Sequence, residues 1–305
     1  MMASVTITRK TEGFVDWTAV GLGLGAAISW GITQAVMKLG ILRVDGVIFA
    51  FLRPAIALVF IVPFVFLASE FTFVSTWVTA VAVAGGVLNA FVGTALYYYA
   101  VKRSPVHQAA SLANTSPFWS VVLAVLFLRE SPTAATFAAA VLVVAGSYLL
   151  MRRNEQDRHP SANILPLMAA LGAGLLWGFS AAVPAKYCLS HGMNGPTYEL
   201  ILIASAGFCW AVLAVPRILR HGMRVSWSGW LCAIVTAVLG FVVGWILWLE
   251  ALARVDASVL GPINGATALI AFAFGVVFLK EKPNPRAYVG ALLIFGGVVL
   301  VSLLG

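Results

Sequence analysis

Long runs of apolar residues alternate with short polar segments along the whole chain. A helix needs about 20 apolar residues to cross the hydrocarbon core of a bilayer. These runs are apolar on every side, whereas the strands of a membrane barrel alternate apolar and polar residues. Ten runs have the required length, at residues 17–38, 46–68, 75–101, 107–128, 132–150, 163–186, 197–219, 228–252, 256–279 and 284–304. The pattern therefore predicts an all-α integral membrane protein with ten transmembrane helices.

The two parts of the chain on either side of one hydrophilic segment resemble each other. With an offset of 151 residues, Gly93 aligns with Gly244 and Glu130 aligns with Glu281. The predicted organisation is a polar tail at 1–16, a first five-helix repeat at 17–151, a linker at 152–162 and a second five-helix repeat at 163–305. Because five is an odd number of spans, the second repeat must enter the membrane from the opposite side. Such inverted repeats are typical of secondary transporters.

Composition and charge exclude several other classes of protein. The chain is 61% hydrophobic and 10% charged, whereas a soluble domain carries about 25% charged residues. Lysine and arginine lie mostly at the ends of the predicted helices, where they contact lipid headgroups, so the net charge of +8 does not indicate a nucleic-acid partner. No P-loop or H-E-x-x-H motif occurs, and the three cysteines lack the spacing of metal ligands. We therefore expect no enzyme activity, no cofactor and no metal site.

A basic residue, a glutamate, one further residue and a proline follow the fourth apolar run, and the same pattern follows the ninth. The residues concerned are Glu130, Pro132, Glu281 and Pro283. Ser131 and Asn284 each precede a proline, a pair typical of the N-cap and the first position of a helix. The glutamates would then lie at the positive ends of the dipoles of the fifth and tenth helices. We predict a structural role for this tract, and direct contact with a substrate is the alternative.

Three ionisable residues inside predicted spans are candidates for coupling or charge pairing, because a charge in lipid is costly and usually has a function. Arg53 lies about two turns into the second span, from which it either reaches the membrane surface or holds an anionic group in a cavity. If transport is coupled to protons, Glu199 or Glu250 is the expected carrier. For Glu250, an ion pair with Arg254 four residues later is the alternative.

Polar and aromatic residues at matching places in the two repeats are candidates for a substrate site. Asn264 lies in a stretch interrupted by Gly-Pro, which frees backbone carbonyls and predicts that the ninth helix lines the transport pathway. Tryptophan and tyrosine could wall an apolar or cation-binding pocket, or they could belong to the interfacial belts of the membrane. The candidate substrate-binding residues are Trp30, Gln34, Tyr97, Asn114, Trp177, Trp248 and Asn264.

Small residues recur every four positions in the first helix of each repeat. They are Gly23, Ala27 and Gly31 in one repeat, and Ala170, Gly174 and Gly178 in the other. In a bilayer, where packing replaces the hydrophobic effect between helices, such stripes let two backbones approach closely. We therefore predict that both helices pack tightly against neighbours.

Taken together, the chain resembles the EamA-type transporters of the drug/metabolite transporter superfamily over essentially its whole length. The residues that carry the resemblance are Trp30-Gly31, Trp177-Gly178, Ala100, Ala251, Phe127-Leu128-Arg129-Glu130, Phe278-Leu279-Lys280-Glu281, Gly146 and Gly297. The resemblance implies ten helices around a central cavity and alternating-access transport of small metabolites, often export of amino acids or related compounds. It does not identify the substrate.

We expect a small-molecule substrate, surrounding membrane lipids and a bacterial-type plasma membrane, in a monomer or homodimer. Proton coupling and substrate exchange are both open as driving forces. A non-transporting membrane sensor or scaffold on the same fold is the alternative function. The resemblance suggests that both termini are cytoplasmic. Five lysines and arginines fall on that side and thirteen on the other, however, so the positive-inside rule favours the reverse orientation.

Overall fold

Every regular element of the described chain is a helix, as the apolar runs predict. The computed structural model describes residues 16–41, 43–69, 71–104, 106–151, 164–278 and 284–305. Eight of its helices are long and apolar enough to cross a membrane, and two shorter apolar helices cover Ser116–Leu128 and Ala134–Leu150. The protein is thus a multi-pass membrane protein. The predicted tail at 1–16 (apart from Asp16) and the whole of the predicted linker at 152–162 lie outside the described residues.

The α-helices of the two repeats correspond in the same order. The first contains α1 (Trp17–Ile41), α2 (Gly46–Pro63), η1 (Phe64–Ala68), α3 (Thr76–Gly86), η2 (Val87–Gly93), α4 (Thr94–Arg103), α5 (Val106–Ala113), α6 (Ser116–Leu123), η3 (Ala124–Leu128) and α7 (Ala134–Met151). The second contains α8 (Ile164–Ser190), α9 (Gly195–His221), α10 (Trp227–Ala237), η5 (Val238–Val243), α11 (Gly244–Arg254), α12 (Ala257–Asn264), α13 (Ala266–Val277) and α14 (Pro285–Leu304). The η elements are π-helical turns within longer spans. Element η2 corresponds to η5, whereas η1 and η3 have no counterpart among the described elements of the second repeat.

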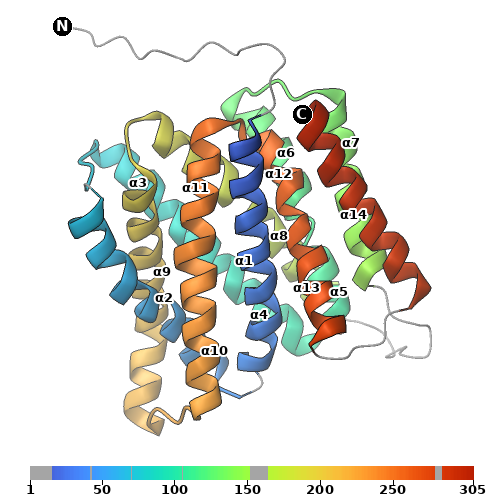
Figure 1. Ribbon diagram of the computed structural model, residues 1–305. Helices are drawn as coiled ribbons and strands as arrows, with labels where there is room; N and C mark the ends of the chain where they lie inside the picture. The colour runs from blue at the N-terminus through green and yellow to red at the C-terminus, as the bar shows by residue number, and fades with distance from the viewer. Residues whose placement is uncertain (1–15, 42, 70, 105, 152–163, 279–283) are drawn as a thin grey trace, which may run out of the picture.

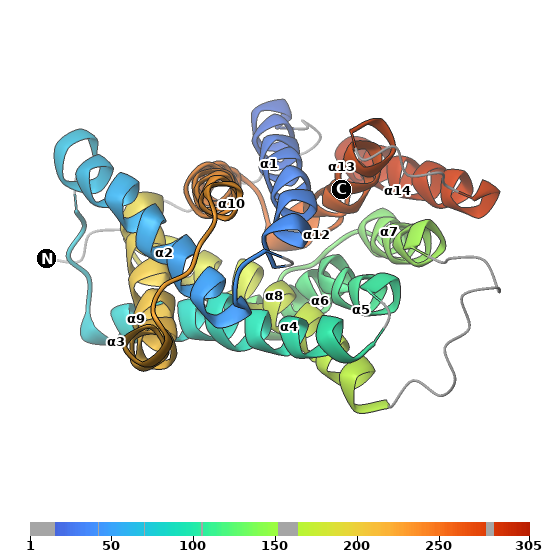
Figure 2. The ribbon, with the colours of Figure 1, turned by 90° about the horizontal axis from the view of Figure 1, so that it is seen from below.

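Each repeat contributes its first helix to the other repeat. Helix α1 packs mainly on α11, α13 and α10 of the second repeat, and α8 packs on α4, α5 and α6 of the first. In Figure 1, α1 begins and α14 ends at the same end of the bundle, which we call the terminal end. Figure 2, a view along the bundle, shows α7 beside α14 at one side and α2 beside α9 at the other. The repeats therefore interlock rather than form two separate bundles.

The small-residue stripes are the surfaces on which this interlocking depends. A Cβ atom on Gly31 would lie 2.8 Å from the carbonyl oxygen of Thr267, and one on Gly178 would lie 2.5 Å from that of Ser116. Both distances are too short for a carbon atom, so the backbones of the paired helices are already in contact. The predicted tight packing is confirmed in both repeats, and in each case the partner helix belongs to the other repeat.

The fourth and ninth spans are interrupted near the middle, at matching places. Helix α5 ends at Ala113 and α6 begins at Ser116, and α12 ends at Asn264 directly before α13. The third and eighth spans each contain a π-helical stretch at equivalent positions, η2 and η5. A π-turn bonds each N–H to the carbonyl five residues back, which shifts the register of the helix and is frequent at functional sites.

The outer surface of the bundle suits a lipid environment. Large apolar side chains are exposed on many helices, including Phe66, Leu67, Phe208, Leu219, Leu292 and Phe295. Exposed tryptophans stand at or beside the first residue of three helices, Trp17 in α1, Trp77 in α3 and Trp227 in α10. Tryptophan at these positions is typical of the interface between hydrocarbon and headgroups. These three tryptophans are not among the candidate site residues.

Candidate substrate-binding cavity

A cavity of about 150 Å³ lies between the two repeats and is lined by both. Cavities of this size accommodate a ligand such as benzene. The aromatic lining residues are Trp30, Tyr97, Trp177, Phe241 and Trp245, and the amide side chains are those of Gln34, Asn89, Asn114 and Asn264. Hydroxyl groups come from Thr33, Thr94, Ser116, Ser147 and Thr267. This mixture of apolar walls and a few polar groups is typical of small-molecule sites.

Six of the seven candidate substrate-binding residues line this cavity: Trp30, Gln34, Tyr97, Asn114, Trp177 and Asn264. Asn264 ends α12 at the interruption of the ninth span, where its Oδ1 accepts a hydrogen bond of 2.9 Å from the Thr267 hydroxyl. The residues that follow it, Gly265 and Ala268 among them, also line the cavity. The ninth span thus lies on the cavity, at the break that the Gly-Pro sequence predicts.

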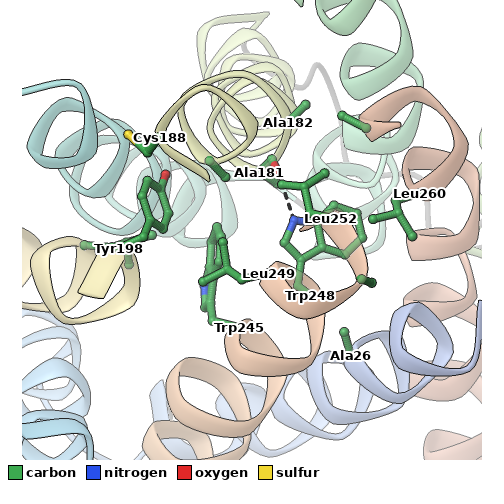
Figure 3. Close-up of a cluster of buried hydrophobic side chains, with 14 of the residues drawn as sticks. Ala26, Ala181, Ala182, Cys188, Tyr198, Trp245, Trp248, Leu249, Leu252 and Leu260 are labelled. Carbon is green, nitrogen blue, oxygen red and sulfur yellow. Dashed lines mark hydrogen bonds between the residues drawn. The ribbon is translucent and has the colours of Figure 1, made fainter. Parts of the chain in front are cut away.

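Trp248, the seventh candidate, lies outside the lining. Its side chain is fully buried in the core, and its Nε1 donates a hydrogen bond of 2.9 Å to the carbonyl oxygen of Ala181. Figure 3 shows the indole ring directed at that carbonyl among Ala26, Leu252 and other apolar groups. Trp245, one turn earlier in α11, takes the lining position. The offset of 151 residues aligns Trp248 with Tyr97, which lines the cavity. In the second repeat, the lining aromatic residue lies one turn earlier than this alignment predicts.

Two tryptophans support the cavity wall through equivalent hydrogen bonds. Trp30 Nε1 donates to the carbonyl oxygen of Gly240 at 2.8 Å, and Trp177 Nε1 donates to that of Asn89 at 3.1 Å. Both acceptors lie in the π-helical stretches η5 and η2, and the offset between them is 151 residues. A π-turn displaces a carbonyl from the regular helical ladder, and the buried indole N–H needs an acceptor. Each first helix is thereby attached to the third span of the other repeat.

Arg53 lies on the cavity and does not reach the membrane surface. It is 8% exposed, and its guanidinium lies 4.9 Å from the centre of the Phe241 ring. Nη1 lies 3.5 Å from the sulfur of Met37, a weak acceptor. Nε is buried and has no hydrogen-bond partner among the described residues. Of the two placements considered for Arg53, the structure therefore has the one in the cavity.

The two candidate carriers of a proton differ sharply in their surroundings. Glu199 is fully buried in α9, outside the cavity lining, and neither of its carboxyl oxygens has a hydrogen-bond partner in the described part of the chain. Glu250 has a side chain that is 54% exposed, and its Oε1 lies 2.8 Å from Nη2 of Arg254. For Glu250, the ion pair that was the alternative is present. Of the two candidates, only Glu199 is buried, and its role as a proton carrier stays a prediction.

Glu130 has a structural role, but it caps a different helix from the predicted one. Its Oε1 accepts a hydrogen bond of 2.9 Å from the backbone N–H of Ala257, and its Oε2 accepts one of 2.8 Å from that of Ser258. These are first-turn groups of α12 in the second repeat. Asp256 occupies the N-cap position of α12, but its side chain makes no capping bond. The carboxylate from the other repeat therefore satisfies the free N–H groups and the dipole of α12.

The start of the fifth helix also differs from the prediction. Helix α7 begins at Ala134, and the hydroxyl of Thr133 accepts a hydrogen bond of 3.2 Å from the N–H of Thr136. Thr133 is thus the cap, and Pro132 precedes it. The tenth helix begins as predicted, since Pro285 follows the N-cap Asn284, whose side chain accepts from Ala287 N–H at 2.9 Å. Glu281 and Pro283 lie outside the described residues.

Several lining residues were not among the candidates from the sequence. Thr33 and Met37 lie one turn from Trp30 and Gln34 on the same face of α1, so a helical projection could have included them. Phe241 lies in η5, where the π-turn changes which residues face inward. A change of helical register of this kind has no signal in the apolar pattern.

The interlocked ten-helix fold and the cavity between its repeats are those of a secondary transporter. A model of the EamA-like transporter family matches residues 17–152 and 164–303. The chain belongs to this family, which consists of transporters and not of enzymes. A solved crystal structure with 20% sequence identity has the same fold, with a TM-score of 0.79 over 94% of this chain and 99% of that chain.

Several transporters from other organisms are similar to this chain. The pseudopaline exporter CntI of Pseudomonas aeruginosa (strain UCBPP-PA14) is 24% identical over 67% of this chain and 66% of its own length. The threonine/homoserine exporter RhtA of Escherichia coli (strain K12) is 25% identical over 68% of this chain and 65% of its own. An uncharacterized transporter of Archaeoglobus fulgidus is 22% identical over 92% and 97%. The matches to the first relatives thus span about two thirds of their length.

Proposed function

We propose that this protein exports small amino acids or related metabolites across the plasma membrane by alternating access. The cavity between the repeats is the substrate site, and it is the observation that carries the proposal. Its volume of about 150 Å³ suits a small metabolite, and both repeats supply its walls. The names of CntI and RhtA, which describe exporters, support the direction and the class of substrate.

The lining chemistry favours a substrate with both apolar and polar parts. The indoles of Trp30, Trp177 and Trp245 offer flat apolar faces that also attract cations. Amide and hydroxyl groups around them donate and accept hydrogen bonds without a charge. A small amino acid has a short apolar side chain and an ammonium group, and both match this lining.

The contacts of α12 suggest how the terminal end opens and closes. Glu130 of the first repeat binds the first turn of α12, and α12 ends at Asn264 in the cavity wall. Nearby, Lys186 donates hydrogen bonds to the carbonyl oxygens of Leu252 and Val255, at 2.7 and 2.8 Å, where α11 ends. Opening at the terminal end would have to release Glu130 from α12. We therefore expect this contact to stabilise the state that is closed at that end.

The test is transport by the purified protein in liposomes. Liposomes loaded with each of the twenty amino acids in turn are diluted into the same compound labelled with an isotope, and uptake by exchange is measured. We expect at least one small amino acid to accumulate faster than in protein-free liposomes. A cavity variant, Trp245→Ala, should reduce this rate far more than it reduces folded yield. If no compound in the panel or in a wider metabolite set exchanges, the transporter proposal fails, and a sensor or scaffold becomes the better interpretation.

A further inference from the structure

Arg53 is a buried positive charge without a carboxylate partner in the described chain. It is the only charged residue among the described lining residues of the cavity. Its neighbours are the Met37 sulfur, the Phe241 ring and the phenol of Tyr98, and none of these groups carries a compensating negative charge. An unpaired buried charge is expensive, and membrane proteins retain such a charge where it serves a substrate or ion pathway. The lack of an anionic partner among the described residues points to a ligand.

A further polar group without a partner lies near this arginine. The hydroxyl of Thr33 is buried and has no hydrogen-bond partner among the described residues. A Cβ atom on Gly240 would lie 2.8 Å from Cγ2 and 3.2 Å from the hydroxyl oxygen of Thr33, and 3.3 Å from Nη2 of Arg53. Thr33 and Arg53 therefore both pack closely around Gly240, and all three residues line the cavity. A ligand in the cavity beside Gly240 could approach the hydroxyl and the guanidinium together.

We infer that Arg53, with Thr33 beside it, forms a carboxylate-binding subsite, so that the cavity selects substrates carrying one carboxylate. Guanidinium presents parallel N–H donors that match the two oxygens of a carboxylate, and hydrogen bonds of this kind are among the strongest in proteins. One positive charge balances one carboxylate, whereas a phosphate dianion would leave a second charge uncompensated in the cavity. This inference rests on the proposed function, and it adds the group by which the substrate is recognised.

The rest of the cavity then receives the remainder of the substrate. Trp245 and Trp30 lie edge to face with ring centres 5.7 Å apart, and together they present an aromatic wall. The hydroxyl of Ser147 is buried, lines the cavity and has no hydrogen-bond partner in the described chain. An aromatic wall and a free hydroxyl can hold an ammonium group. Because both are uncharged, they can also be left without one. Carboxylate recognition is therefore the selective step.

The experiment compares matched compounds in the same exchange assay. Each amino acid that exchanges in the liposome panel is tested against its carboxamide, which has the same shape and no negative charge, and inorganic phosphate is added as a competing anion. We expect the carboxamide to compete on the order of 30-fold more weakly and phosphate not to compete. Carboxamides that exchange as well as the acids would overturn the subsite and leave the transporter proposal intact. Effective competition by phosphate would show a general anion site and overturn carboxylate selection. Absence of all exchange would overturn both.

Variants assign the selectivity to Arg53. In Arg53→Met, an apolar side chain of similar length replaces the buried charge, and we expect the preference for the acid over the amide to disappear. Arg53→Lys should restore part of it, which a purely structural role for the residue would not predict. The control is Arg217→Met, since Arg217 lies on the surface with its side chain 51% exposed, 3.6 Å from Asp45. A preference that persists in Arg53→Met would overturn the assignment. If that variant does not fold, Thr33→Val provides the same comparison, with a smaller loss expected.

Discussion

The bonds between Glu130 and α12 connect the two repeats at the terminal end, so Glu130→Ala is the sharpest test of how this end is closed. The substitution removes both acceptors, at 2.9 Å from the N–H of Ala257 and 2.8 Å from the N–H of Ser258. Nothing else on α12 replaces them, because the side chain of Asp256 makes no capping bond. The N–H groups of Ala257 and Ser258 would lose their hydrogen-bond acceptors, and the positive end of the α12 dipole would lose the negative charge beside it.

The size of the effect follows from the type of bond. Removal of an N-cap side chain costs about 0.5–2 kcal/mol, and a hydrogen bond to a charged group contributes about 1.5–3 kcal/mol. Glu130 is only half buried, so water can replace part of the loss. We therefore expect Glu130→Ala to lower the free energy of unfolding by about 2–3 kcal/mol. Glu130→Gln keeps an amide oxygen as one acceptor, and we expect a loss of about 1 kcal/mol.

Unfolding in mixed micelles, followed by tryptophan fluorescence as the fraction of denaturing detergent is raised, measures these differences. Glu250→Ala is the matched control, because Glu250 also lies at the terminal end. Its exposed ion pair with Arg254 spans one helical turn, and we expect its loss to cost no more than about 0.5 kcal/mol. Equal losses in Glu130→Ala and Glu250→Ala would refute the conclusion that Glu130 stabilises the junction of the two repeats.

Three further predictions concern packing, the cavity and coupling. Gly178→Ala places a methyl group against the backbone of α6, and we expect a loss of about 1–3 kcal/mol in the same unfolding assay, whereas Gly21→Ala, with no atom within 4 Å of the new carbon, should have little effect. Trp245→Ala should reduce exchange far more than Trp227→Ala in the same span, because Trp227 is 81% exposed; equal effects would place substrate elsewhere. Glu199→Gln should abolish any component of transport driven by a pH gradient, and an unchanged pH response would exclude Glu199 as the carrier.

Some features of the fold follow from local chemistry, and for these the sequence was sufficient. Each span could be identified because its run is long enough and apolar on all sides, which a helix needs in order to cross a bilayer. Asn284 and Pro285 marked the start of α14, since this cap is made by residues adjacent to the helix in the sequence. The interruption at Asn264 was also predictable, because Gly-Pro weakens the helix wherever it occurs.

The candidate site could be predicted in part for the same reason. Internal symmetry placed Trp30 and Trp177 at equivalent positions, and both line the cavity. Symmetry was misleading for Trp248, because its indole N–H binds the carbonyl of Ala181 in the core, whereas Trp245 lines the cavity. This contact between α11 and α8 leaves no mark in the spacing of apolar residues, so the placement of the two tryptophans required the structure.

The sequence by itself determined that ten helices cross a membrane in two related halves, and which residues within them are polar, small or aromatic. Only the tertiary structure decided that α1 belongs to the packing of the second repeat, that Glu130 caps α12 and that Arg53 and Thr33 line the cavity beside Gly240. The reason is that insertion depends on properties summed along one helix, whereas these contacts join residues far apart in the chain. Their partners depend on how each helix is rotated and shifted against the others.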